Sequence, residues 1–269
     1  LFNVLQKNKL SRPPSFANLG VNYSDSRIIG PFLNSEKAFV RLNSFVNSSN
    51  DGSFSEDLKM QYGVSSIFTL PLIKKSSILN RVLAPKFMIS FNEHDGETDG
   101  DYFIGTDELS FGNIYEVQKY SSLSENEKGF SLSAGVDYSI NWHDKRKFKL
   151  SLAALKMEGS SYVPRSSSGF ETNEFSYLGG FKYENKKSII LSGEGLFSSQ
   201  GEALRADLKT EYNSTNFDVS GKYEFLDAKA DTRLIEDLKN FQLSSSLKIF
   251  EKINLTSKNR YDLVQASMV

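Results

Sequence analysis

The residues best suited to metal binding or catalysis gather in one acidic stretch, residues 93–101 (EHDGETDGD). Carboxylates along a loop can bind Ca²⁺, but this spacing does not match the EF-hand loop, which needs a bidentate glutamate at its last position. His94 and His143 are the only histidines, and neither has a second imidazole at metal-ligand spacing. No nucleophile elbow, phosphate-binding loop or dinucleotide fingerprint is present. We therefore interpret residues 93–108 as a solvated acidic loop and expect no metal, no cofactor and no enzymatic activity.

A second group of reactive side chains occupies alternate positions between residues 204 and 225. The candidates in this group are Arg205, Asp207, Lys209, Glu211, Asp218, Lys222 and Glu224. They alternate with apolar residues such as Leu204, Leu208 and Val219. Because the side chains of a strand point to opposite faces with period two, the pattern predicts strands with one charged and one apolar face. The charged face would contact water in a soluble sandwich, or line a wet lumen in a barrel.

The same alternation recurs along the chain and predicts an all-β, antiparallel fold of about a dozen strands. The predicted strands are residues 17–23, 37–47, 58–70, 81–92, 109–119, 131–142, 147–158, 174–183, 188–198, 204–212, 217–225, 241–250 and 253–263. Pro71 is expected to end the strand before it, because proline has no N–H to donate to a ladder. Residues 233–239 could form one helical turn within a polar loop.

Composition excludes several classes of protein. The formal net charge is −1, which gives no electrostatic reason to expect nucleic acid as a partner. The chain has no cysteine, so disulfides and thiolate metal sites are excluded within it. No segment approaches the roughly 18 apolar residues of a membrane helix. The chain begins without methionine or a leader, and we interpret residues 1–269 as an internal fragment forming part of one larger domain.

Strand length and aromatic placement favour a transmembrane barrel over a sandwich. The predicted strands have about ten residues, which exceeds the usual five or six and matches the roughly nine to eleven that cross a bilayer at a tilt. Aromatic girdles at both interfaces are typical of such barrels. Three aromatics are predicted to precede short turns on one side and three to lie at the opposite strand ends: Trp142, Tyr183 and Tyr212, then Tyr223, Phe225 and Tyr261.

Loop lengths differ between the two predicted ends of the strands. Short turns on one side would be residues 143–146, 184–187, 213–216 and 251–252, and longer loops on the other would be 121–129, 159–173 and 226–240. Short periplasmic turns and long outer loops give this asymmetry in outer-membrane barrels. The loop at 93–108 does not fit, because strand parity places it on the short side.

Three stretches resemble the barrel of the outer-membrane lipopolysaccharide-assembly family, LptD. Residues 78–86 (ILNRVLAPK) resemble the family's strand start of the form l-x-P. Residues 105–112 (GTDELSFG) resemble its G-x-D-R-x-E-x-G stretch, with Glu108 where arginine is usual. The third stretch follows the order of the family's later strands and comprises 168–170, 177–180, 223–225 and 260–263. The resemblance covers most of the chain, although each motif is short.

The resemblance implies a partial transmembrane β-barrel in the outer membrane of a Gram-negative bacterium. In that family the barrel inserts lipopolysaccharide into the outer leaflet, with an LptE-like plug lipoprotein inside it. Lipopolysaccharide arrives along a periplasmic LptA-like bridge that contacts an N-terminal jellyroll, which together with the barrel seam would lie outside this fragment. Outer-membrane lipids would surround the barrel. The alternative is a general porin or solute channel, and a soluble carbohydrate-binding sandwich is a third possibility.

Overall fold

The computed structural model describes residues 15–48, 54–95, 110–116, 128–158, 174–186, 188–227, 237–250 and 253–263. These residues form one antiparallel sheet of 13 strands. The strands are β1 (Ser15–Ile29), β2 (Phe32–Ser48), β3 (Phe54–Thr69), β4 (Leu72–Lys75), β5 (Leu79–His94), β6 (Gly129–Trp142), β7 (Lys147–Glu158), β8 (Phe175–Glu184), β9 (Ile189–Phe197), β10 (Ala203–Asn213), β11 (Phe217–Leu226), β12 (Leu238–Phe250) and β13 (Ile253–Asp262).

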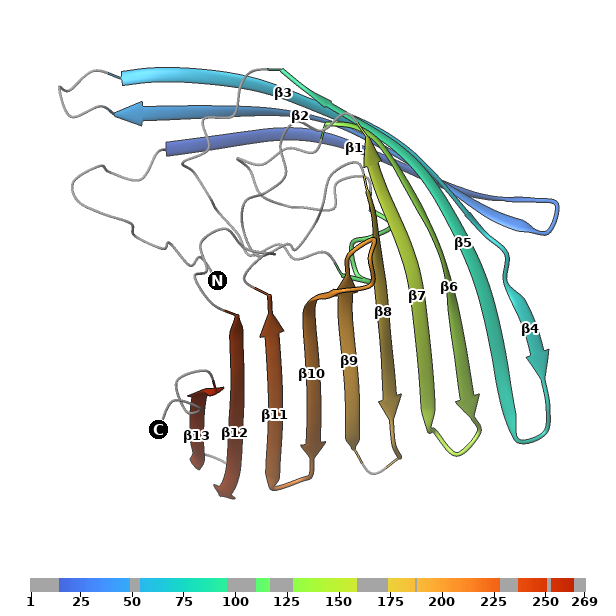
Figure 1. Cartoon of the computed structure of the whole chain (residues 1–269), viewed down its shortest axis with the longest axis vertical. Coiled ribbons are helices and arrows are strands. Elements are labelled where there is room, and N and C mark those ends of the chain that lie inside the picture. The colour runs from blue at the N-terminus through green and yellow to red at the C-terminus, as the bar shows by residue number, and fades with distance from the viewer. Residues whose placement is uncertain are drawn as a thin grey trace.

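The strands follow one another across the sheet in chain order, with the short β4 beside β5 (Figure 1). The predicted all-β, antiparallel class is therefore confirmed, and the described residues form one sheet rather than the two of a sandwich. β1 and β13 lie at opposite edges, so the sheet is open. Within the described ranges, no helix has the length and apolar character needed to span a membrane.

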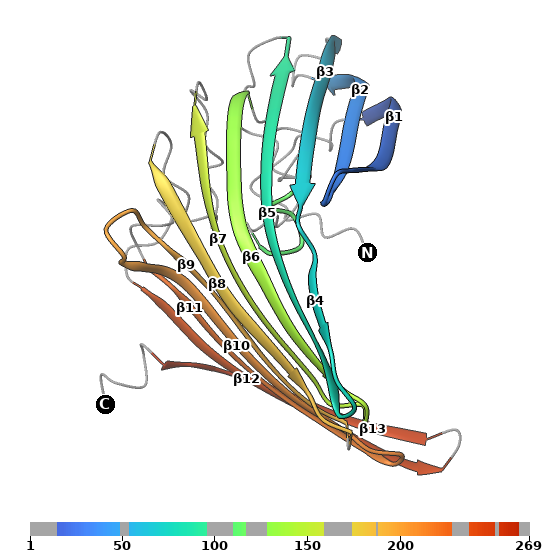
Figure 2. The ribbon, with the colours of Figure 1, turned by 90° about the vertical axis from the view of Figure 1, so that its right-hand side faces the viewer.

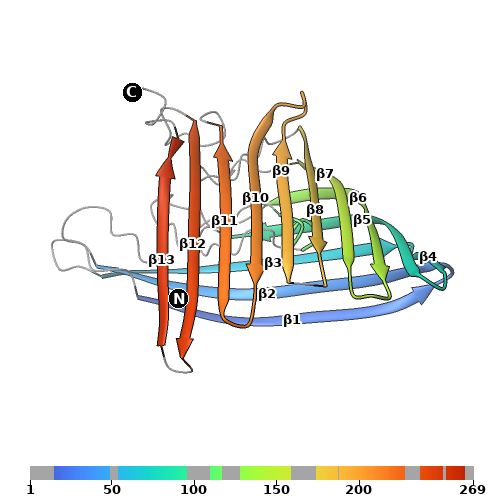
Figure 3. The ribbon, with the colours of Figure 1, turned by 90° about the horizontal axis from the view of Figure 1, so that it is seen from below.

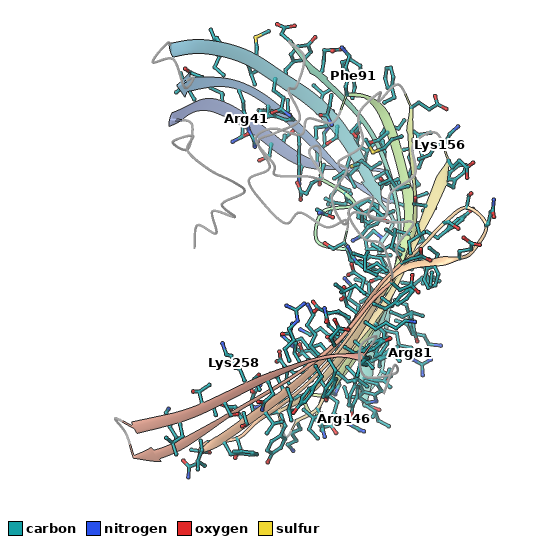
Figure 4. The ribbon with its side chains drawn as sticks, turned by 60° about the vertical axis from the view of Figure 1, so that its left-hand side comes forward. Arg41, Arg81, Phe91, Arg146, Lys156 and Lys258 are labelled. Atoms are coloured by element: carbon teal, nitrogen blue, oxygen red, sulfur yellow. The ribbon has the colours of Figure 1, made fainter. Side chains whose placement is uncertain are left out.

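The sheet is strongly curved and twisted. Figure 2 shows β5 to β11 spreading apart from their lower ends, and Figure 3 shows β1, β2 and β3 crossing the direction of β9 to β13. The right-handed twist of each strand accumulates over many strands and produces this shape. Arg41 and Lys258 point to the concave side in Figure 4, whereas Phe91 and Lys156 point to the convex side.

The strand register separates apolar from polar residues between these two faces. In the β10–β11 pair, Leu208 lies opposite Tyr223 on the convex face, and Lys209 lies opposite Lys222 on the concave face. The ladders from β1 to β13 extend both faces across the whole sheet. Every strand pair therefore contributes to one convex apolar face and one concave, mainly polar face.

Large apolar side chains on the convex face are exposed. Val21 is 72% exposed, Val40 48%, Leu152 51% and Leu208 46%. Buried hydrophobic residues of the described ranges form only a small set, most of it on the concave face. An exposed apolar face that extends over so many strands is unusual for a soluble monomer, whose largest apolar patch is about 300–600 Å².

One cluster of polar residues interrupts the convex face near the turn at Gly30. Arg27 of β1 forms an ion pair with Glu36 of β2. The Asn34 amide donates to Glu36 at 3.2 Å, and the Ser66 hydroxyl of β3 donates to Asn34 at 2.9 Å. The cluster lies at the ends of these strands rather than at their middle.

The aromatic residues predicted at strand ends all lie on the convex face. Trp142, Tyr183 and Tyr212 lie in the last two residues of β6, β8 and β10. Tyr223, Phe225 and Tyr261 approach the opposite ends of β11 and β13, and the Phe241 and Tyr261 rings stack with centroids 6.4 Å apart. The Arg146 guanidinium lies over the Trp142 ring, 5.3 Å from its centroid.

The predicted strand at 109–119 is wrong. Residues 110–116 form consecutive turns, while residues 109 and 117–119 lie outside the described ranges. Without this strand, the connection 95–128 joins the ends of β5 and β6 on the side of the long loops. The apparent exception in the loop lengths therefore disappears.

The predicted helical turn at 233–239 is also wrong at its end, because Leu238 and Lys239 belong to β12, and residues 233–236 lie outside the described ranges.

Two prolines mark the break between β3 and β4. β3 ends at Thr69, as predicted from Pro71, and β4 resumes pairing with β5 at Leu72. The Leu70 N–H donates to the carbonyl of Pro85 at 2.9 Å. In a strand the N–H and C=O of one residue point to the same edge, so the missing N–H of Pro85 faces this break. Pro85 therefore removes no hydrogen bond from the ladder between β5 and β6.

Candidate functional site

The seven charged candidates lie together on the concave face of β10 and β11. Asp207 lies directly opposite Glu224, Glu211 opposite Ser220, and Asp218 opposite Asn213. The register brings these residues into one patch because β10 and β11 form a hairpin with a tight turn at 214–216.

Ion pairs along and between the strands balance the charges of this patch. Lys209 pairs with Glu211, and Lys222 pairs with Glu224, each two positions along its own strand. The Gln242 amide of β12 also donates to Glu224, at 3.2 Å. A patch of mixed charge holds neither anions nor cations tightly.

Arg205 differs from the other candidates because it is buried. Its side chain is 5% exposed, against 50% for Lys209 and 40% for Lys222. Its guanidinium lies 3.3 Å from a Glu194 oxygen and 3.5 Å from an Asp207 oxygen. Arg205 therefore holds two carboxylates of the wall in position, while Lys209 and Lys222 present exposed cations.

A bulge at the start of β10 corrects the predicted placement of Leu204. The pairing with β9 shifts register between Ala203 and Arg205. Leu204 was predicted on the same face as Leu208, but it is 3% exposed and belongs to the buried cluster with Leu196 on the concave side. A bulge inserts an extra residue, so strict alternation fails at this point.

Residues 110–116 lie against the concave face and form what we call the inner segment (Figure 3). Ile114 is fully buried, and Phe111 and Tyr115 pack beside it. The floor beneath them consists of Ala153, Leu155, Met157, Leu178, Leu196 and Leu204. This is the main apolar cluster among the described residues, and it buries a strip of the otherwise polar concave wall.

Sequence reasoning did not identify the inner segment as part of the site. One signal was available: residues 150–155 (LSLAAL) are apolar at odd as well as even positions, which indicates a strand covered on both faces. β7 has Leu152 on the convex face and Leu155 on the concave face. The pattern predicts that something covers β7 from inside, but it does not identify the covering segment.

Two glycines make room for the rings of the inner segment. A Cβ at Gly135 would lie 2.3 Å from the Tyr115 hydroxyl, and one at Gly180 would lie 2.8 Å from the Phe111 ring. The Lys86 ammonium lies over the Tyr115 ring, 5.2 Å from its centroid. Burial, together with the nearby Asp137 charge, raises the pKa of Tyr115, so its hydroxyl stays protonated.

Gly135→Ala is expected to lower the free energy of unfolding by about 1–3 kcal/mol, which is the cost of overpacking. The added Cβ would also lie 2.4 Å from the Leu152 carbonyl oxygen and 2.9 Å from the Ala153 Cα, and backbone cannot move aside cheaply. Gly179→Ala is the matched control, because its Cβ would meet only side chains at 3.6 Å or more. Urea titration of refolded protein in detergent micelles measures both. Equal loss in the two variants would contradict the close packing at Gly135.

The described part of the acidic stretch forms an ion pair rather than a cluster of ligands. Glu93 binds Lys128 at 2.6 Å, and its hydrogen bond raises the pKa of that lysine. The Asp95 N–H donates to the Met60 carbonyl at 2.9 Å. No group of three or more potential metal ligands occurs among residues that the structure describes. Residues 96–108, which contain the rest of the predicted loop, lie outside them.

Comparison with protein families finds no family model that matches the chain, and comparison with curated proteins finds no match either.

Proposed function

We propose that this chain forms part of an outer-membrane β-barrel that delivers lipopolysaccharide to the outer leaflet. The barrel would enclose the concave face and present the convex face to lipid. In the complete barrel, further strands would cover the edges at β1 and β13, because exposed edge strands invite aggregation. A plug lipoprotein and a periplasmic bridge would be its partners, and lipopolysaccharide its cargo.

The observation that carries this proposal is the separation of the two faces. Leu208, Val219 and Tyr223 belong to the apolar convex face, on which Leu208 is exposed and the other two are half-buried. Lys209, Ser220 and Lys222 belong to the polar concave face. Fully burying one leucine or phenylalanine contributes about 1.5–3 kcal/mol, so a whole face of such residues favours an apolar surrounding. Lipid provides that surrounding for every strand at once.

Strand dimensions support a membrane-spanning arrangement. β6 has 14 residues, β7 has 12 and β10 has 11. A tilted strand needs roughly nine to eleven residues to cross the hydrocarbon layer. The concave wall next to β10 also offers exposed lysines beside carboxylates, which suits brief contacts with phosphates and hydroxyls of a glycan. The resemblance at 78–86 and 105–112 supports lipopolysaccharide as the particular cargo.

The alternative is a general diffusion channel for small hydrophilic solutes. The ion pairs Lys209–Glu211 and Lys222–Glu224 favour this function, because a wall of balanced charge is also typical of porins. The two functions differ in what depends on the protein: surface lipopolysaccharide in the first, and solute uptake in the second.

Photo-crosslinking in the full-length protein tests the proposal. A photoreactive residue at Lys209 or Lys222 is expected to trap lipopolysaccharide, in a manner that depends on energised supply from the periplasm. The same photoreactive residue at Leu208 should trap phospholipid instead, because Leu208 is next to Lys209 in β10 but points to the convex side. Depletion of the protein should reduce lipopolysaccharide at the cell surface. If depletion slows solute uptake and leaves surface lipopolysaccharide unchanged, the channel alternative is correct.

A further inference from the structure

Two parts of the concave face differ in their cover. The inner segment covers the apolar floor contributed by β7, β8, β9 and the start of β10. From Lys209 of β10 to β13 the concave side is polar. The Ser220 and Ser244 hydroxyls form a hydrogen bond of 2.6 Å, and Lys258 of β13 is exposed. We call this second part, on β10 to β13, the polar wall.

Polar contacts attach the inner segment both to strands that precede its floor and to the floor itself. Glu116 binds Lys37 of β2 at 2.7 Å. The Ser133 hydroxyl of β6 donates to the Ile114 carbonyl at 3.0 Å, and the Phe111 N–H donates to Glu194 of β9 at 3.4 Å. The attachments therefore span the sheet from β2 to β9.

The inner segment also has hydrogen bonds of its own. The Ile114 N–H donates to the Ser110 carbonyl at 2.9 Å, and the Glu116 N–H donates to the Asn113 carbonyl at 2.8 Å. The Asn113 side chain accepts from the Ser110 N–H at 2.7 Å. Backbone groups that turn away from the sheet are thus paired within the segment, which stabilises its folded shape.

Apolar burial holds the segment more strongly than its ion pair does. Burying an isoleucine side chain such as Ile114 contributes about 1.5–3 kcal/mol. A partly exposed ion pair such as Lys37–Glu116 contributes about 0–1 kcal/mol. The experiment that releases the segment must therefore change Ile114 or Phe111, not the ion pair.

We infer that the inner segment is a built-in stopper: it closes the side of the lumen next to β7, β8 and β9, and cargo passes along the polar wall. The inference rests on the proposed barrel and names the route within it. Its consequence is a limit on the size of hydrophilic molecules that can leak through the protein. A glycan or other hydroxyl-rich molecule would meet Lys209, Lys222 and Lys258 on this route.

The test compares full-length variants that loosen the stopper from two positions. Ile114→Ser removes the buried anchor, and Phe111→Ala removes the ring that packs over Gly180. Gly112→Ala is the control in the same segment, because Gly112 is exposed and its added Cβ would meet only the Ser110 hydroxyl, at 3.3 Å. Conductance in planar bilayers and uptake of a large hydrophilic antibiotic by cells are the two measurements.

Both loosened variants are expected to conduct several-fold more current than the unchanged protein and to admit the antibiotic, while Gly112→Ala behaves as the unchanged protein. A photoreactive residue at Lys258 should trap cargo as one at Lys209 does. Heat-modifiable migration shows which variants are folded, and Phe111→Ala serves if Ile114→Ser does not fold. Folded variants with unchanged conductance would overturn the stopper, and would leave the proposed delivery of lipopolysaccharide untouched if surface lipopolysaccharide still depends on the protein.

Discussion

Leu208→Lys is expected to destabilise the protein folded in bilayers by about 2–4 kcal/mol, which is the cost of a lysine on the lipid face at the membrane midplane. Leu208 lies at the middle of β10 on the convex face and is 46% exposed. Val219→Lys should cost less, because Val219 is only two residues from the start of β11 and lies nearer the interface. Urea-dependent folding into lipid vesicles measures both variants.

Ser220→Lys is the matched control for these two lysines. Ser220 lies on the concave face, directly opposite Glu211, so a lysine there gains a carboxylate neighbour and remains in contact with water. The expected order of destabilisation is therefore Leu208, then Val219, then Ser220. If Ser220→Lys were as harmful as Leu208→Lys, the convex face would not be the lipid face.

Leu155→Ala is expected to destabilise the protein by about 2–5 kcal/mol, because it removes a buried side chain and leaves a cavity beneath the inner segment. Leu155 is fully buried in the cluster that contains Ile114. A double-mutant cycle with Ile114→Ala should therefore show a coupling energy of about 0.5–3 kcal/mol. Equilibrium unfolding in urea of the two single variants and the double variant provides this value.

Leu152→Ala is the control in the same strand. Leu152 is 51% exposed on the convex face, so its loss removes contact with the surroundings but opens no cavity against the inner segment. Its cycle with Ile114→Ala should be additive within about 0.3–0.5 kcal/mol. Strong coupling of Leu152 to Ile114, or none for Leu155, would contradict the placement of the inner segment.

Period-two alternation predicted the faces of β10 and β11 well because nearly every second residue there is charged, and Ser220 in the same series is polar. The positions of Asp207, Lys209 and Glu224 on one face follow from parity alone, provided that no residue is inserted. The bulge between Ala203 and Arg205 breaks this condition, and Leu204 was consequently placed on the wrong face. A bulge changes one backbone conformation and leaves no mark in the pattern of polar and apolar residues.

The inner segment and the first hairpin show the other limit of alternation. Phe111, Ile114 and Tyr115 are apolar because they contact a floor built by distant strands, and this tertiary reason was misread as a strand of its own. Residues 24–36 were not assigned to strands, yet most of them extend β1 and β2 to the turn at Gly30, where polar and apolar residues do not alternate strictly. Ladder hydrogen bonds stabilise these strand ends without apolar alternation.

Strand order equal to chain order has a consequence for the speed of folding. Hairpins such as β6–β7, joined by four residues at 143–146, can form from neighbours that are already close. The junction of β5 with β6 spans the connection 95–128, which is about eight times longer and therefore costs about 1.8 kcal/mol more in loop-closure entropy, at roughly 0.6 kcal/mol per doubling. The inner segment lies within this same connection, so its docking and the joining of β5 to β6 are expected to occur together as the slowest local step. Two preassembled sheet halves, β1–β5 and β6–β13, would then be the last kinetic intermediates before the continuous sheet.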